Sequence, residues 1–154
     1  MINVMFVCYG NICRSPMGEF VLKDMVEKRG IADKFHIESA ATSDYEIGNP
    51  VHHGTRDKLA KYGISVAGKY ARQITKKDYE DYDYILLMDE LNVTKIKDTI
   101  PADPDNKICK LLEYAGSERD IADPWYTGNF DVTYDDIVEG CEAFLAHLEK
   151  NNLI

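Results

Sequence analysis

The sequence lacks the features that membrane insertion and export require. No apolar run approaches the roughly 20 residues of a transmembrane helix. The first ten residues lack the basic segment and the long apolar segment of a signal peptide. No internal repeat or low-complexity linker divides the chain. These absences predict one cytoplasmic domain over residues 1–154, with no membrane partner.

Basic residues are scarce. The chain has 18 Lys and Arg against 27 Asp and Glu, which gives a formal net charge of −9. This excess of negative charge argues against nucleic acid or an anionic membrane as the main partner. A phosphorylated substrate would therefore have to be captured by local positive charge, because the global field repels it.

Cysteine is also sparse, with four residues at positions 8, 13, 109 and 141 and no Cys-x-x-Cys pair. The four histidines are scattered along the chain. Metal centres need clustered ligands at set spacings, so we expect neither a metal nor another cofactor. In a reducing compartment all four cysteines should be free thiols.

Apolar runs instead alternate with helical patterns. Strands are expected near residues 2–7, 35–40, 84–88 and 107–112, and helices over 15–29 and 52–62 and from Asp89 and Thr133 onward. Strands that alternate with helices favour parallel pairing through right-handed crossovers. The sequence thus predicts an α/β fold, a three-layer α/β/α domain with a central four-stranded parallel sheet and a phosphate-binding loop after strand 1.

That loop is the most informative segment of the chain. Cys8 to Ser15 read Cys-Tyr-Gly-Asn-Ile-Cys-Arg-Ser, directly behind an apolar strand. Ser15 is a suitable N-cap, with Pro16 at the first helical position. A strand, a tight loop and a helix N-terminus together form an anion cradle. The expected phosphate-binding residues are Tyr9, Gly10, Asn11, Ile12, Cys13, Arg14 and Ser15.

Two side chains of this loop suit a site that binds a phosphate group and attacks it. Only the thiolate form of a cysteine attacks, and loop N–H groups, the helix N-terminus and Arg14 would all favour the anion at Cys8. The Ser15 hydroxyl could donate to the sulfur if it points back into the loop. A guanidinium holds two phosphate oxygens at once, which suits Arg14 to phosphate binding. The alternatives are an ordinary buried thiol and a surface salt bridge.

Two further loop residues favour unusual backbone conformations. Gly10 fits a sharp turn or a close approach of ligand to backbone. Asn11 can adopt a left-handed conformation and either brace the loop with its amide or be an ordinary turn residue.

A proton donor for the leaving group is expected at Asp123, in the run Asp-Pro-Trp-Tyr. Pro124 restricts the backbone of Asp123 to extended conformations. Trp125 and Tyr126 offer flat apolar surface beside the carboxyl group. On local pattern alone, an Asp-Pro pair is more often just a turn.

These features, with others along the whole chain, resemble the low-molecular-weight protein tyrosine phosphatases. The shared motifs are Val7-Cys8 to Pro16, Ser39-Ala40-Ala41-Thr42-Ser43, Gly48-Asn49-Pro50, Ala71-Arg72-Gln73-Ile74, Met88-Asp89 and Asp123-Pro124, in family order. A Cys-x5-Arg loop alone occurs in unrelated phosphatase folds. Its N-terminal position together with the distant Asp-Pro pair is specific to this family.

The resemblance implies a hydrolase that cleaves phosphotyrosine (aryl phosphate) monoesters in a protein or peptide, with inorganic phosphate as product and inhibitor. It implies that Cys8 forms a cysteinyl-phosphate, that Arg14 binds the phosphoryl group, and that Asp123 is the general acid and then the base. Asn11, Ser15 and Ser39 match the hydrogen bonds that brace the loop. The implied substrate cleft is lined by Tyr9, Ile12, Tyr45, Glu46, Trp125 and Tyr126.

Cys13, and two positions at which this sequence differs from the family pattern, bear on the redox behaviour of the nucleophile, the bracing of the loop and the choice of substrate. In the family a cysteine at the place of Cys13 can trap the oxidised nucleophile as a disulfide; the alternative is a small packing residue. Lys69 stands where the family often has histidine, in the outer part of the bracing. Tyr9 stands where an aliphatic residue is common, and its polar tip would bear on leaving-group preference.

Two other functions fit the same loop. Arsenate reduction can use this fold, but it usually needs further relay cysteines, for which Cys109 and Cys141 are poorly placed. A non-catalytic module that only binds phosphate would use the Cys8 to Ser15 loop and would have no use for a proton donor at Asp123. The sequence does not choose between phosphotyrosine, phosphoarginine or another phosphomonoester as the physiological substrate, and it leaves the oligomeric state open.

Overall fold

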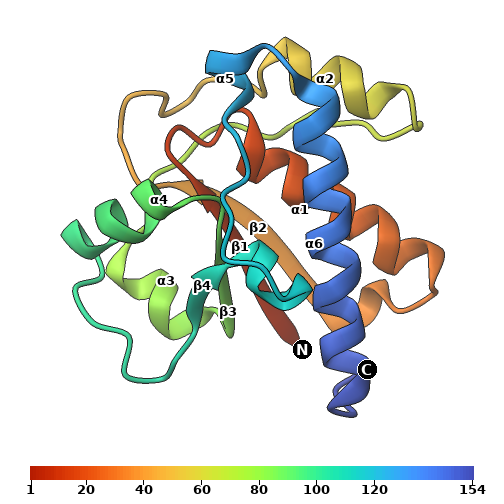
Figure 1. Cartoon of the computed structure of the whole chain (residues 1–154), viewed down its shortest axis with the longest axis vertical. Coiled ribbons are helices and arrows are strands. Elements are labelled where there is room, and N and C mark those ends of the chain that lie inside the picture. Colours follow the sequence, from red (N-terminus) through yellow and green to blue (C-terminus); the bar gives the residue numbers. More distant parts are fainter.

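The computed structural model describes residues 1–154 and consists of a central parallel sheet with helices on both faces (Figure 1). The strands are β1 (Ile2–Cys8), β2 (Phe35–Ala41), β3 (Tyr84–Leu87) and β4 (Ile108–Lys110). The α-helices are α1 (Arg14–Lys28), α2 (His53–Ala60), α3 (Lys76–Asp81), α4 (Glu90–Lys95), α5 (Pro124–Thr127) and α6 (Phe130–Lys150). Short 3₁₀ helices cover Ala32–Lys34, Ile96–Asp98 and Leu111–Ala115.

The sheet has the order β2-β1-β3-β4, and every pair of neighbouring strands is parallel. This confirms the predicted fold class. In β1 the register runs from Ile2 opposite Phe35 to Cys8 opposite Ala41, so β1 is paired along its whole length. A central strand of a covered parallel sheet must be apolar on both faces, and the run Val4 to Val7 is fully buried.

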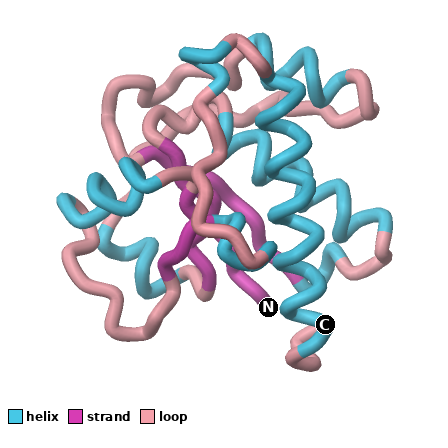
Figure 2. The backbone as a smooth tube through the Cα atoms, in the orientation of Figure 1, coloured by secondary structure: helices cyan, strands magenta, loops and turns pink.

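Alternating residues of β1 enter two separate cores. Val4 and Phe6 belong to the larger core with α1 and α6. Met5 and Val7 face the opposite side, where residues from the α3 and α4 region cover the sheet. This is the period-2 alternation of a strand that lies between two helical layers. Figure 2 shows the strands as the middle of the three layers. No helix is both long enough and apolar enough to cross a membrane.

Two predicted helix starts were wrong. Helix α1 begins at Arg14, and Cys13 precedes it without a side-chain cap, so Ser15 is not the N-cap and Pro16 is the third helical residue. The Ser15 hydroxyl is directed to the loop instead. Helix α6 begins at Phe130 and not at Thr133, because the Asn129 side chain accepts the Val132 N–H and caps the helix one turn earlier.

Other elements differ in extent. The fourth strand covers only Ile108–Lys110, since residues 111–115 turn into a 3₁₀ helix. Helices α3 and α5 were not predicted. They are six and four residues long, too short to show an apolar period, and side-chain caps at Thr75 and Asp123 start them. These caps matter for function, because Asp123 is one of the expected site residues.

Candidate active site

The candidate site lies beyond the carboxyl end of β1, where residues 9–13 form a loop that leads into α1. Four backbone carbonyls of residues 8–13 point away from the loop centre and accept hydrogen bonds from residues outside the loop. The Cys8 and Tyr9 carbonyls accept from the N–H groups of Thr42 and Ser43, and the Ile12 carbonyl accepts from the N–H of His52. The Cys13 carbonyl accepts from the Met17 N–H and from Thr55 Oγ1. A peptide N–H points opposite to its carbonyl. The N–H groups of residues 9, 10, 13 and 14 are therefore turned toward the loop centre, as an anion cradle requires.

The sulfur of Cys8 lies at the floor of this loop and is nearly fully buried. It accepts a hydrogen bond from the Asn11 N–H at 3.3 Å and lies 3.0 Å from Ser15 Oγ. Both contacts supply donors to a sulfur anion. The Ser15 hydroxyl thus points back into the loop, which was the condition for its hydrogen bond to the sulfur.

Asn11 has a left-handed backbone, with φ of +58°. Its side-chain oxygen accepts the Arg72 N–H at 3.1 Å, and its amide nitrogen donates to Ser15 Oγ at 2.8 Å and to Ser39 Oγ at 2.9 Å. The side chain is thus fully used in tying the loop to β2 and to the segment around Arg72. Of the two alternatives for Asn11, the geometry is that of a brace.

A buried carboxylate extends this bracing. Ser39 Oγ donates to Glu19 Oε1 at 2.5 Å, and Glu19 is only 3% exposed. We call Asn11, Ser15, Ser39 and Glu19 the bracing network. Glu19 was not among the residues expected from the sequence, although it stands one helical turn after Ser15 on α1. The signal that could have found it is a charged residue on the face of α1 that packs against the sheet.

Lys69 joins the same network. Its ammonium donates to the Ser39 carbonyl at 2.7 Å and lies 3.3 Å from Glu19 Oε1. A lysine therefore occupies the outer position of the bracing in this chain.

Arg14 is 2% exposed and is held by three acceptors. Its Nη1 donates to Asp89 Oδ2 at 2.6 Å and to the Ile121 carbonyl at 2.9 Å, and its Nη2 lies 3.4 Å from Asp123 Oδ2. Burial alone would lower the pKa of Arg14, but the charges of Cys8 and Asp89 outweigh it and raise the pKa. The guanidinium therefore stays charged beside the sulfur.

Asp89 was seen in the sequence only as part of a shared motif and as the start of a helix. It does start α4, because its Oδ1 accepts the Asn92 N–H at 2.8 Å. Its other oxygen holds Arg14. One carboxylate at the end of β3 thus fixes both a helix and the guanidinium.

Asp123 reaches the loop from the far end of the chain. The segment before it is tied to the sheet, since the Ile121 N–H donates to the Met88 carbonyl at 2.9 Å. Asp123 Oδ1 accepts the Trp125 N–H at 3.1 Å and caps α5, while its Oδ2 faces Arg14. The Asp-Pro pair is therefore not just a turn: it starts helix α5, and this helix start brings a partly exposed carboxyl group beside Arg14.

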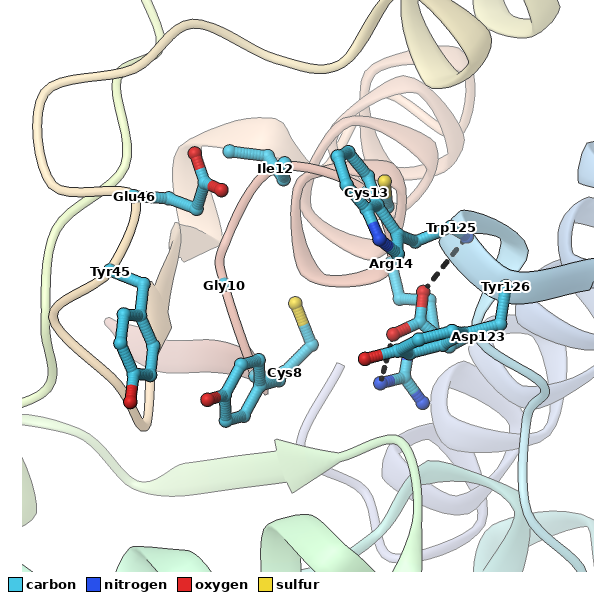
Figure 3. Close-up of a pocket in the computed structure, with 11 residues that line it drawn as sticks. Cys8, Gly10, Ile12, Cys13, Arg14, Tyr45, Glu46, Asp123, Trp125 and Tyr126 are labelled. Carbon is cyan, nitrogen blue, oxygen red and sulfur yellow. Dashed lines mark hydrogen bonds and ion pairs between the residues drawn. The ribbon is translucent and has the colours of Figure 1, made fainter. Parts of the chain in front are cut away.

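Aromatic side chains form two walls above the sulfur (Figure 3). Tyr45 lies on one side, with the centroid of the Tyr9 ring 5.8 Å from that of Tyr45, and Trp125 and Tyr126 lie on the other. The pocket between them has a volume of about 360 Å³ and is lined by Cys8, Tyr9, Gly10, Ile12, Cys13, Arg14, Tyr45, Glu46, Asp123, Trp125 and Tyr126. All the residues expected to form the cleft are brought together here. Ser39 lies beneath the loop and does not line the pocket.

His52 supports one of these walls. Its ring meets the Trp125 ring edge-on at 5.5 Å and stacks on Phe130, and its Nδ1 accepts the Gly54 N–H at the start of α2. Burial, followed by the neighbouring His53, lowers the pKa of His52, so the ring tends to be neutral. The sequence predicted a helix that starts at residue 52, and it did not reveal the contact of His52 with Trp125.

The other cysteines differ in their surroundings. Cys13 lines the pocket, and burial together with the charge of Cys8 raises its pKa to about 12. Cys141 is fully buried on α6 in the larger core, and Cys109 is half-buried on β4. Neither Cys109 nor Cys141 lines the pocket.

Comparisons with known proteins show the family to which the chain belongs. The family model for low molecular weight phosphotyrosine protein phosphatase matches residues 3–153. The low molecular weight protein-tyrosine-phosphatase YfkJ of Bacillus subtilis is 41% identical over 152 residues, which covers 97% of each chain. The phosphatase PtpA of Staphylococcus epidermidis is 38% identical and covers 98% of this chain and 96% of its own.

Solved structures of the same family have the same fold as this chain. The crystal structure of YfkJ superposes with a TM-score of 0.93 at 42% identity, covering 98% of this chain and 96% of that one. The structure of Wzb from Vibrio vulnificus, in complex with benzylphosphonate, has a TM-score of 0.82 at 25% identity and covers 96% and 99% of the two chains. The chain therefore belongs to the low molecular weight phosphotyrosine protein phosphatase family and is a protein tyrosine phosphatase.

Proposed function

We propose that this phosphatase hydrolyses phosphotyrosine in proteins or peptides in two steps, with Cys8 as the nucleophile, Arg14 as the phosphoryl-binding residue and Asp123 as acid and base. The supporting observation is that the Cys8 sulfur, the Arg14 guanidinium and the Asp123 carboxyl line one pocket between aromatic walls. An aryl ring fits between flat walls, and the loop N–H groups suit phosphate oxygens.

In the first step the Cys8 thiolate attacks phosphorus and the bond to the tyrosine oxygen breaks. Asp123 gives its proton to that oxygen, so the product leaves as a neutral phenol. The Asn11 N–H and Ser15 hydroxyl stabilise the thiolate before attack. Arg14 and the loop N–H groups stabilise the charge on the phosphoryl oxygens in the transition state.

In the second step the ionised Asp123 accepts a proton from a water molecule that attacks the cysteinyl-phosphate. The sulfur–phosphorus bond breaks, which restores the thiolate and releases inorganic phosphate. The product fits the same cradle as the substrate, so we expect phosphate to inhibit competitively. The benzylphosphonate bound to Wzb is an aryl-bearing anion of this kind.

We also propose that residues 1–154 work as one domain. The larger core contains residues from β1 to α6, from Val4 to Leu148, and the site itself joins positions 8 and 123. A division of the chain would separate parts of the same core and the same site.

The decisive experiment replaces Cys8 by Ser. The variant should lose turnover of p-nitrophenyl phosphate and of a phosphotyrosine peptide by about 10⁴-fold or more. It should still bind inorganic phosphate, since Arg14 and the loop N–H groups are unchanged. Robust turnover by Cys8→Ser would overturn the assignment of the nucleophile. Acid-quenched wild-type enzyme should carry phosphate on Cys8, detectable by mass spectrometry.

A further inference from the structure

The wall that Trp125 forms beside the pocket (Figure 3) has little support from its own segment. Trp125 lies on α5, a helix of only four residues, and it is 57% exposed. A helix this short has too few internal hydrogen bonds to fix its own position. Trp125 makes one aromatic pair in the structure, the edge-on contact with the His52 ring, whose centroid lies 5.5 Å from that of the indole. His52 is therefore the side chain that can hold the indole in place.

His52 is itself held on three sides. Its backbone N–H donates to the Ile12 carbonyl at 2.8 Å, which ties the residue directly to the phosphate-binding loop. Its ring stacks on Phe130 with the planes 10° apart, and Phe130 fills the space beside Gly54, where a Cβ would have no room. Its Nδ1 accepts the Gly54 N–H at 3.0 Å, which fixes the rotation of the ring and leaves the proton on Nε2. His52 thus connects the loop that binds phosphate to the wall beside it.

These contacts need the neutral imidazole. A protonated ring carries hydrogens on both nitrogens, so its Nδ1–H would face the Gly54 N–H and the ring would have to turn away. Three ionisable side chains act on the ring: His53 on α2, Asp123 at the start of α5 and Glu46 in the loop after β2. Burial and His53 lower the pKa of His52 and outweigh the two carboxylates, which raise it. The ring is therefore mainly neutral above about pH 6.5.

We propose that His52 is a positioning residue for the aryl group of the substrate: its neutral ring holds Trp125 at a fixed place relative to the phosphate-binding loop. The proposal rests on the proposed placement of the aryl ring between the aromatic walls. Inorganic phosphate fills only the loop, whereas an aryl ligand also contacts the wall. His52 therefore contributes to the binding of aryl ligands and not to the binding of phosphate.

The test measures the dissociation constants of benzylphosphonate and of inorganic phosphate by calorimetry at pH 7, for wild type and three variants. His52→Asn removes the ring but keeps an acceptor for the Gly54 N–H, because asparagine is a good N-cap. His52→Phe keeps a ring and removes the acceptor. His53→Asn is the matched control, since His53 is exposed, stacks on His52 and forms no aromatic pair with Trp125.

We expect His52→Asn to weaken the binding of benzylphosphonate by about two- to tenfold, the effect of losing one aromatic contact, and to leave the binding of phosphate unchanged. His52→Phe should bind benzylphosphonate as tightly as wild type does. It should unfold at a lower temperature, because it lacks the acceptor at the start of α2. His53→Asn should match wild type for both ligands.

Fluorescence reports the contact directly, because Trp125 is the only tryptophan in the chain. A charged imidazole in contact with an indole quenches its emission, so the emission of wild type should titrate with a midpoint below about pH 6.5. His53→Asn should keep this titration at a higher midpoint, since His53 lowers the pKa of His52. His52→Asn and His52→Phe should both lack it.

Unchanged binding of benzylphosphonate by His52→Asn would overturn the proposal. So would an equal loss for both ligands, because the phosphate-binding loop and not the wall would then have moved, or an emission titration that persists in both His52 variants. If His52→Asn does not fold, His52→Phe still decides. Below the midpoint wild type should bind benzylphosphonate more weakly than His52→Phe does, and equal binding there would refute the role of the neutral ring. Turnover by Cys8→Ser would instead overturn the proposed function, and the two failures are distinguishable because these measurements concern binding alone.

Discussion

Replacing Asp123 by Asn tests the proton transfer separately from the structure around it. Asp123 both faces Arg14 and caps α5 through the Trp125 N–H at 3.1 Å. An alanine would remove the cap as well as the proton, at a cost of about 1 kcal/mol in stability. Asparagine caps equally well and has the same shape, so Asp123→Asn removes the proton and leaves α5 in place. The contact with Arg14 at 3.4 Å is long, and its loss should have a small effect on stability.

The expected effect depends on the leaving group. A positioned general acid contributes about 10²- to 10⁴-fold, equivalent to about 2.7 to 5.4 kcal/mol of activation free energy. Phosphotyrosine needs this help, because its phenolate is a poor leaving group. Nitrophenolate leaves with little need for a proton. Asp123→Asn should therefore lose kcat/KM on a phosphotyrosine peptide by 10²-fold or more, and on p-nitrophenyl phosphate by at least tenfold less than that.

The assay is steady-state kinetics on both substrates, with Asp57→Asn as the control. Asp57 is an exposed carboxylate on α2, paired only with Arg56, so this variant makes the same chemical change outside the pocket. It should leave both rates unchanged. Equal losses on the two substrates in Asp123→Asn would remove Asp123 from the acid role. An unchanged melting temperature in Asp123→Asn would confirm that the cap is intact.

Three further predictions follow from particular contacts. Ser15→Ala removes one of the two donors to the Cys8 sulfur and should lower kcat by about tenfold with little change in KM; an unchanged rate in a kinetic assay would contradict the role of this hydroxyl. Burial raises the pKa of the Cys13 thiol, so disulfide formation between peroxide-oxidised Cys8 and Cys13, with loss of water, should accelerate steeply from pH 7 to 9. Mass spectrometry would detect this bond, and a rate that does not vary with pH would contradict a thiolate attack by Cys13. Gly18→Ala places a methyl group 2.6 Å from the fully buried Phe6 ring, and it should destabilise the protein by about 1–3 kcal/mol in urea unfolding, whereas full stability would mean that the ring can move aside.

The sequence by itself determined the fold class and the central loop. The run from Val4 to Val7 is apolar on both faces, which is possible only for a strand buried between two layers. The Cys-x5-Arg spacing and the Asp-Pro pair identified the residues that the structure brings into one pocket. These signals are local, because they depend on residue types at short, fixed separations.

Only the tertiary structure decided what surrounds those residues. Glu19 and Lys69 are 50 positions apart and meet because α1 and the segment before Arg72 both lie against β2. Asp89 holds Arg14 because β1 and β3 end side by side in the sheet. Ser15 reads as a helix cap in the sequence, but α1 begins at Arg14, two residues before the expected first helical residue Pro16, and the Ser15 hydroxyl is free to contact the Cys8 sulfur. Contacts between distant segments depend on packing and register, which no local pattern specifies, and for this reason the contacts of Asp89 with Arg14 and of Lys69 with Glu19 were visible only in the folded chain.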